Sequence, residues 1–525
     1  MRSARLTVAL MCTALLAASC GDGRNDGVSA TGSASRTDPT VAPAKSSVTG
    51  ATGTPQTDST SVDTSSPDSS AQAFGWKKLG SSVSVQTGKI RVPIDYKDPS
   101  QGSFELYIAR HMATNPAKRI GSLLVNPGGP GFGGSDFALY AERTYSKSLL
   151  ERFDIVAWDP RGTGKSTPPI DCVDDYDRYF AGTDITPDNA NERQKIIDLT
   201  KEFETKCVIK NAKILQYVGT NNSARDMDSI RKALGETKIS YFGFSYGSEL
   251  GAAWVTLFPD TVRAAVLDGA ADPNADFLTS GLQQSAGFEN SIGTFLKRCG
   301  ATKSCGFYNL GNAEKAFDTL MLALDDTPIP STPGRPDVTR AMALTAVAEA
   351  MYSESTWPTL EAALASAQGG DGAELLGLYD EYYQRQSDGT YDNSLEAFQT
   401  ISCMDTAERL TVAEDDASAA KFIAIAPRFA PGTTGSYFCT FYPPAKDPRV
   451  AITGKGAGKV LVVGTTGDPA TPLSSTENMA KALEGGVLLV VKADQHTGYR
   501  VNQCSFNAVD NYLLSLDVPA SGTRC

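Results

Sequence analysis

The chain has 525 residues, of which 41% are hydrophobic, and a net charge of −12 at pH 7. This length can bury a large core and is long enough for more than one structural unit. The negative charge is spread along the chain without a basic patch, so nucleic acid is not an expected partner. With two histidines and no C-x-x-C spacing, we also expect no bound metal and no cofactor.

The N-terminus is predicted to be an export signal at residues 1–19. A basic start is followed by an apolar stretch, Leu6–Ser19, that is too short to span a bilayer. The small residues before Cys20 resemble the lipobox of bacterial lipoproteins, in which the cysteine is diacylated and becomes the new N-terminus. The alternative is ordinary cleavage beside an incidental cysteine, because Ala17 stands where a lipobox usually has leucine. We expect Cys20 to anchor the protein to the outer face of the cell membrane, or the protein to be released to the cell wall or medium.

Residues 20–72 are expected to form a tether. They consist mainly of Gly, Ser, Thr, Ala, Asp and Pro, with almost no large apolar side chains. Such a segment cannot bury enough apolar surface to offset the entropy lost on ordering. The tether would hold the folded part away from the membrane, and the lipid is the only membrane contact that we expect.

The cysteines indicate disulfides. Without Cys12 in the signal and Cys20 at the anchor, eight remain, an even number that suits four disulfides in an exported protein. The sequence alone allows about 105 connectivities. Clustering in consecutive pairs favours Cys172–Cys207, Cys299–Cys305, Cys403–Cys439 and Cys504–Cys525, each of which closes a local loop.

Continuous apolar runs alternate with helical patterns in residues 73–273. An early hairpin is expected at residues 89–96 and 103–110, where apolar and polar residues alternate. Buried strands then follow, with helices between several of them at residues 191–211 and 222–234. This alternation predicts the first part of a mostly parallel sheet with crossover helices. The predicted buried strands are residues 121–126, 153–158, 239–242 and 264–268.

Residues 274–447 are predicted to form a large helical insertion, because no strand pattern interrupts their helical periodicity convincingly. Strand patterns return in residues 448–525, which we expect to complete the sheet. An insertion at this point would lie over the carboxyl ends of the strands, as a cap on an active site. The helical examples are residues 313–325, 338–352 and 360–367, and the late elements are strands at 459–464 and 486–491 and a helix at 502–516.

The motif Gly243-Phe-Ser-Tyr-Gly247 lies between a strand pattern and a helical pattern. Ser245 is therefore expected on a sharp strand-to-helix turn, where glycines two positions to either side leave room for a strained backbone. The helix N-terminus beneath it offers free N–H groups to an oxyanion. A serine hydroxyl is a poor nucleophile unless an imidazole takes its proton, so the motif requires a histidine.

His496 is predicted to be that base, because it directly follows the last predicted strand. The other histidine, His111, lies in the early hairpin, where we expect a solvated or structural role. Asp468, on the loop after the strand at residues 460–463, is predicted to orient the imidazole, which gives the order Ser, acid, His. Asp494 is the alternative acid, although its place on the same loop as His496 makes the required approach awkward.

Two backbone N–H groups are expected to bind the oxyanion. One belongs to Tyr246, the residue after the nucleophile, and the other to the glycine-rich loop at residues 126–134. Gly129 is the predicted second donor, with Gly128 as its neighbour. The loop lacks the Lys-Ser/Thr ending of a P-loop and the spacing of a dinucleotide-binding fingerprint.

Five motifs follow one another along the chain: Asn-Pro-Gly-Gly-Pro-Gly at 126–131, Trp-Asp-Pro-Arg-Gly-Thr-Gly at 158–164, Gly-Phe-Ser-Tyr-Gly-Ser at 243–248, Gly-Asp-Pro-Ala-Thr-Pro at 467–472 and the late His496. Together they resemble the secreted tripeptidyl aminopeptidases of actinobacteria, which belong with the proline iminopeptidases among α/β-hydrolase serine peptidases. The resemblance runs from about residue 75 to residue 525 and implies an α/β-hydrolase fold, a mostly parallel sheet with a large helical cap insertion. Pro127 stands where proline iminopeptidases carry His, as in the tripeptidyl branch, which argues against proline-only specificity.

The resemblance also implies an activity. Such enzymes remove short peptides from a free N-terminus, while the cap closes the site and acidic groups hold the substrate α-ammonium. Asp405 and Glu249 are candidates for that contact, and a structural role is the alternative for each. We further expect Asp159 and Arg161 to brace the loops through an ion pair, and Thr471 to hydrogen-bond the acid loop.

The sequence therefore predicts a lipid-anchored, extracytoplasmic and monomeric serine exopeptidase that acts on the N-terminus of a peptide or protein. One alternative is a carboxylesterase or lipase that uses the same residues on ester substrates. A second alternative is a non-catalytic surface-binding protein on this fold, which is disfavoured because all three triad positions are filled.

Overall fold

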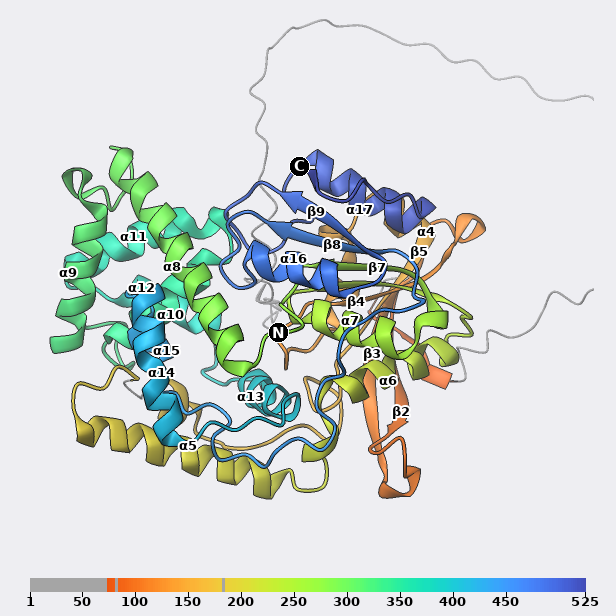
Figure 1. The fold of residues 1–525 in the computed structure, drawn as a ribbon, viewed down its shortest axis with the longest axis horizontal. Coiled ribbons are helices and arrows are strands. Elements are labelled where there is room, and N and C mark those ends of the chain that lie inside the picture. The colour runs from red at the N-terminus through yellow and green to blue at the C-terminus, as the bar shows by residue number, and fades with distance from the viewer. Residues whose placement is uncertain (1–72, 81–83, 182–184) are drawn as a thin grey trace, which may run out of the picture.

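The computed structural model describes residues 73–80, 84–181 and 185–525, and shows a ten-stranded sheet with a separate group of helices beside it (Figure 1). The predicted signal peptide, Cys20 and the tether lie outside the described residues. Within the described ranges, no helix is long and apolar enough to cross a membrane.

The sheet has the order β1-β2-β3-β5-β4-β6-β7-β8-β9-β10. The early hairpin, β2 and β3, is antiparallel and joins β5 antiparallel, whereas every pairing from β5 through to β10 is parallel. The predicted mostly parallel sheet is thus confirmed. The strands are β1 (Lys77–Lys78), β2 (Val85–Pro93), β3 (Ser103–His111), β4 (Gly121–Asn126), β5 (Phe153–Trp158), β6 (Ile239–Phe244), β7 (Val262–Asp268), β8 (Val460–Thr465), β9 (Gly486–Val491) and β10 (Thr523–Arg524).

Helices cover both faces of the sheet, which explains why the central strands are apolar along their whole length. Every residue of β4, β5, β6 and β8 is buried. One face packs against α4 (Lys147–Arg152) and α17 (Gln503–Ser515), and the short α2 (Asp136–Leu139) and α3 (Ala141–Thr144) join this layer. The opposite face packs against α6 (Thr220–Ala233), α7 (Tyr246–Leu257) and α16 (Leu473–Ala482).

The chain between β7 and β8 forms the predicted helical insertion, which we call the cap. It has a hydrophobic core of its own, built around large side chains such as Phe295, Phe317 and Leu344. Its helices are α8 (Phe277–Ala301), α9 (Ala313–Asp326), α10 (Arg340–Met351), α11 (Trp357–Gln368), α12 (Ala373–Tyr382), α13 (Ser394–Met404), α14 (Val412–Ile425) and α15 (Ala430–Thr433).

One predicted crossover helix lies elsewhere. Helix α5 (Ala190–Lys210) precedes β6 in the sequence, but it runs beneath the cap rather than along the sheet (Figure 1). Glu204 on α5 accepts hydrogen bonds from the backbone of Cys439 and Phe441, at 2.8 and 2.6 Å, and from Gln399 on α13, at 2.8 Å. Of the two predicted crossover helices, α6 is therefore the one that packs along the sheet between β5 and β6.

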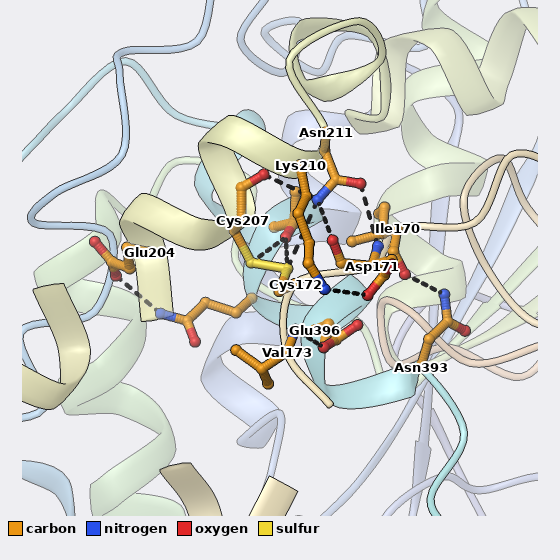
Figure 2. The surroundings of a disulfide bond; sticks show 12 residues. Ile170, Asp171, Cys172, Val173, Glu204, Cys207, Lys210, Asn211, Asn393 and Glu396 are labelled. Carbon is orange, nitrogen blue, oxygen red and sulfur yellow. Dashed lines mark hydrogen bonds and ion pairs between the residues drawn. A yellow bond between two sulfur atoms is a disulfide. The ribbon is translucent and has the colours of Figure 1, made fainter. Parts of the chain in front are cut away.

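A disulfide fixes the C-terminal end of α5 to the segment that leaves the sheet. Figure 2 shows Cys207 bonded to Cys172, beside Glu396 of α13, whose carboxylate accepts the Val173 N–H at 2.7 Å. Asn393 donates to the Ile170 carbonyl at 2.9 Å in the same cluster. The structure joins all four pairs that consecutive pairing favoured, namely Cys172–Cys207, Cys299–Cys305, Cys403–Cys439 and Cys504–Cys525.

Removing the Cys172–Cys207 disulfide should cost more stability than removing Cys299–Cys305. The first closes a loop of 35 residues and the second a loop of 6. In the chain-entropy account, the longer loop restricts the unfolded chain more, by about 1.5 kcal/mol. Denaturant unfolding of the two double-alanine variants measures this difference, and an equal or reversed loss would contradict it.

Candidate active site

Ser245 lies between β6 and α7 with a strained backbone, at φ +54° and ψ −128°. Such a conformation costs about 1–3 kcal/mol and persists only where the surroundings enforce it. The turn is so tight that a Cβ atom on Gly243 would lie 2.2 Å from the carbonyl oxygen of Gly247. The Ser245 N–H donates to the carbonyl of Asp268 at 2.8 Å, which ties the turn to the neighbouring strand. The predicted elbow is therefore present, with its serine half-buried.

His496 and Asp468 meet at the same edge of the sheet. Asp468 follows β8 and His496 follows β9, and Nδ1 of the imidazole lies 2.9 and 3.0 Å from the two carboxylate oxygens. The Asp468 side chain is fully buried and that of His496 is 7% exposed. Thr471 donates its N–H to Asp468 at 2.8 Å, and its hydroxyl lies 3.3 Å from His496 Nδ1, so it does contact the acid loop as expected.

This geometry determines which nitrogen of the imidazole carries the proton. An ionised carboxylate only accepts hydrogen bonds, so Nδ1 carries the proton and Nε2 presents its lone pair. Nε2 is buried, and it has no hydrogen-bond partner within the described part of the chain. Burial lowers the pKa of His496, but the charge and hydrogen bond of Asp468, with the charge of Asp268, raise it above its ordinary value overall. The pair can therefore take up a proton at Nε2 and hold it.

The glycine-rich loop lies directly on the elbow. A Cβ atom on Gly128 would sit 2.8 Å from Ser245 Cβ and 3.1 Å from the Tyr246 nitrogen. The N–H of Gly128 donates to Asn126 Oδ1 at 3.0 Å, so the next residue, Gly129, stays the predicted second oxyanion donor. Tyr246 is the first residue of α7, where a helix leaves its N–H groups without intrahelical partners.

The cap contacts the site from above. The backbone N–H of His496 donates to the carbonyl of Tyr352 at 2.9 Å, and the two rings meet edge to face with their centres 5.5 Å apart. The glycine-rich loop also touches the cap, since a Cβ atom on Gly131 would lie 2.4 Å from the Phe398 nitrogen of α13. The cap therefore lies against both the imidazole and the glycine-rich loop.

The alternative acid does not reach the imidazole ring. The Asp494 carboxylate is paired with Arg298 of the cap helix α8, and its N–H donates to Glu354. The expected ion pair between Asp159 and Arg161 is wrong. Arg161 is fully buried and pairs with Asp226 at 2.5 Å, because that carboxylate of α6 faces it directly.

Two further predicted residues have structural positions. Asp159 accepts the N–H groups of Ser135 and Lys165, both at 2.9 Å, and so still braces two loops. His111 is buried on β3, in a structural position with Nε2 3.5 Å from Glu142.

Both candidate ammonium ligands are engaged within the chain. Glu249 pairs with Arg449. Asp405 accepts hydrogen bonds from the N–H and hydroxyl of Thr220, at 2.6 and 2.5 Å. Burial raises the pKa of Asp405 to about 7.

Sequence reasoning missed two buried carboxylates next to this site. Asp268 ends β7, and Glu349 is the one acidic residue of α10. The Glu349 side chain is 1% exposed, and neither carboxylate oxygen has a hydrogen-bond partner among the residues described. An acid in an otherwise apolar helical pattern, Ala346-Val-Ala-Glu-Ala-Met351, was the signal that could have found it.

Comparison with known proteins agrees with this arrangement. The profile of the α/β hydrolase fold family matches residues 121–499. The chain is 36% identical to serine protease Hip1 of Mycobacterium tuberculosis, over 83% of this chain and 86% of that protein. It is 34% identical to carboxylesterase B of Mycobacterium tuberculosis (85% and 88% covered) and 29% identical to tripeptidyl aminopeptidase of Streptomyces coelicolor (84% and 83% covered). The chain therefore belongs to the α/β hydrolase fold family, and it is a serine hydrolase.

Proposed function

We propose that this serine hydrolase is an exopeptidase that removes short peptides from the free N-termini of peptides. Ser245 Oγ attacks the scissile carbonyl carbon while His496 Nε2 takes its proton, and Asp468 stabilises the imidazolium. The N–H groups of Tyr246 and Gly129 bind the oxyanion. The imidazolium then protonates the leaving amine, and water hydrolyses the acyl-enzyme by the same steps in reverse.

The observation that carries the exopeptidase assignment is the carboxylate of Glu349. A buried carboxylate without hydrogen bonds is costly, and such groups are typical of functional sites. Burial, together with the nearby charge of Glu381, raises the pKa of Glu349 to about 8. A cation that entered here would relieve both effects, and the ammonium of a peptide N-terminus is such a cation.

Glu349 lies one helical turn before Tyr352, the residue that contacts His496. Residues three apart on a helix are neighbours on one face, at about 5–6 Å between Cβ atoms. Burial raises the pKa of Tyr352, and the charges of Glu349 and Asp468 both add to this, so its ring lies within reach of both carboxylates.

Because the Glu349 carboxylate is closed from solvent, the proposal requires α10 and α12 to separate when substrate enters. Closure over the bound peptide would then exclude water from the acyl-enzyme site. The tripeptidyl aminopeptidase relative supports release of short N-terminal fragments, whereas the carboxylesterase relative favours the ester alternative. A neutral ester would leave the buried Glu349 carboxyl group without a partner, which is why we prefer the peptide.

We further propose that the enzyme works outside the cytoplasm, as a monomer anchored through the lipid on Cys20. The four disulfides within the described residues support an oxidising compartment.

Replacing the proposed nucleophile, Ser245→Ala, should lower kcat/KM by about 10⁴-fold or more, because no group would form the acyl-enzyme. Hydrolysis of an N-terminally free tripeptide anilide and of an acetate ester measures the loss. Ser248→Ala, which alters a buried serine three residues further on, is the matched control and should keep its activity within about threefold. Wild-type hydrolysis by Ser245→Ala would show that the nucleophile lies elsewhere.

Glu349→Gln should lower kcat/KM about 10–100-fold for a tripeptide anilide with a free N-terminus, because the ammonium loses its counter-charge. The same peptide with an acetylated N-terminus should be cleaved slowly, and equally by both enzymes. Parallel assays of the two substrates make this comparison. An equal loss on both would mean that Glu349 does not bind the ammonium.

The same substitution should stabilise the substrate-free protein at alkaline pH. Burial raises the pKa of Glu349 from 4.5 to about 8, so its contribution to stability is full below pH 4.5 and is lost as the pH rises through about 8. The melting temperature of Glu349→Gln should therefore exceed that of the wild type by a margin that grows from pH 5 to pH 8.

Glu204→Gln is the matched control for this measurement. Burial raises the pKa of Glu204 as well, to about 7, but its carboxylate accepts three hydrogen bonds, which an amide with one acceptor oxygen cannot all keep. This variant should be less stable than the wild type. A Glu349→Gln variant that lost stability in the same way would contradict the account of an unpartnered charge.

A further inference from the structure

The loop that carries His496, residues 494–501, contains two non-glycine residues with a left-handed backbone. Thr497 has φ +72° and Arg500 has φ +66°. Each such residue costs about 1–2 kcal/mol, so the loop keeps this shape only if contacts from outside fix it. The N–H groups of the three residues after His496 make those contacts.

Two carboxylates receive these three N–H groups. Thr497 donates to Asp468 at 3.4 Å, whereas Gly498 and Tyr499 donate to the two oxygens of Asp268, at 2.7 and 2.8 Å. Asp268 is fully buried at the end of β7, so these bonds are shielded from water. Bonds from N–H groups to an ionised oxygen are about twice as strong as neutral ones.

Asp268 also holds the nucleophile from the other side. Its carbonyl oxygen accepts the Ser245 N–H at 2.8 Å. The next residue, Gly269, lies against the imidazole, since a Cβ atom there would be 2.8 Å from His496 Cε1. The end of β7 therefore contacts both the strained elbow and the ring that must meet it.

We propose that Asp268 is a positioning residue of this active site, which fixes the His496 loop relative to Ser245 and acts on the imidazole as a second carboxylate behind Asp468. The inference rests on the proposed function, because it takes His496 as the general base. An uncharged side chain at this position could still accept a hydrogen bond from the loop, but it would not act on the imidazole as a carboxylate does.

The charge of Asp268 has a measurable consequence. The titratable groups that face His496 are Asp468 from the loop after β8, Asp268 from β7 and Tyr352 from the cap. Burial raises the pKa of Asp268 to about 7, although the N–H groups of Gly498 and Tyr499 and the charge of the His496 imidazolium lower it. Asp268 and His496 therefore favour each other's charged forms. Without the Asp268 charge, the pKa of His496 falls, and the base stays neutral at lower pH.

Asp268→Asn tests the proposal. An asparagine has one acceptor oxygen for two N–H donors, so the loop loses one of its bonds. We expect kcat to fall about tenfold or more with KM within about twofold, because positioning acts on the reacting groups rather than on substrate binding. We also expect the acid limb of the kcat/KM profile to move to lower pH. Tripeptide anilide hydrolysis and fluorophosphonate labelling of Ser245, both measured against pH, give these readouts.

The matched control is Asp510→Asn, on α17. Asp510 is also a buried carboxylate that holds the His496 loop, through the Tyr499 hydroxyl at 3.0 Å, but the imidazole lies outside its contacts. In this variant, the acid limb of the kcat/KM profile should stay at the wild-type pH. Any loss of activity should be no larger than the loss of folded protein. If Asp268→Asn behaves in that same way, or keeps full kcat, the proposal is overturned.

Asp268→Glu covers the case in which Asp268→Asn fails to fold. It keeps the charge but misplaces the oxygens, so kcat should fall while the acid limb stays at the wild-type pH. Wild-type kcat or a displaced limb in this variant would overturn the proposal. A wild-type enzyme that neither cleaves the anilide nor labels at Ser245 would instead overturn the proposed function.

Discussion

The buried hydrogen bond between the His496 imidazole and the Asp468 carboxylate is the interaction on which the site depends. It joins two loops that follow neighbouring parallel strands, and it can form only because those strands end at one edge of the sheet. A charge this deeply buried needs several donors, and Asp468 receives N–H groups from Ala470 and Thr471 besides the imidazole. The order of the strands in the sheet thus brings the imidazole and its carboxylate together.

The cap contributes the remaining side of the active site. It closes over the imidazole through Tyr352, and it brings near the site the carboxylate of Glu349, which has no hydrogen-bond partner in the described ranges of the chain. Two disulfides, Cys172–Cys207 and Cys403–Cys439, brace the part of the chain where α5 and α13 meet. These cross-links fix the chain where α5 and α13 meet, and the proposed exopeptidase would have to open elsewhere to admit a chain terminus.

Several parts of the fold and site were predictable from sequence because few alternatives existed. With only two histidines in the chain, the position of His496 after a late apolar strand left one candidate base. Apolar runs located the central strands, since strands covered on both faces carry that pattern. The helical insertion was recognisable because its period differs from that of the strands on either side.

The remainder depends on contacts between distant segments, which periodicity does not report. Helix α5 has the helical pattern of a crossover, and only the partners of Glu204 reveal that it lies on the cap. Arg161 and Asp226 are 65 positions apart, so local spacing suggested Asp159 instead. Asp268 looked like a strand end followed by a turn, and its role appears only when Gly498 and Tyr499 are placed beside it.

The most direct test of the account is a time course of digestion of an unmodified peptide library, followed by mass spectrometry. An exopeptidase that holds the N-terminal ammonium a fixed distance from Ser245 should release N-terminal fragments of one short length, with successive truncations in that same register. Fragments cut from within the chain, or single amino acids released one at a time, would contradict this account.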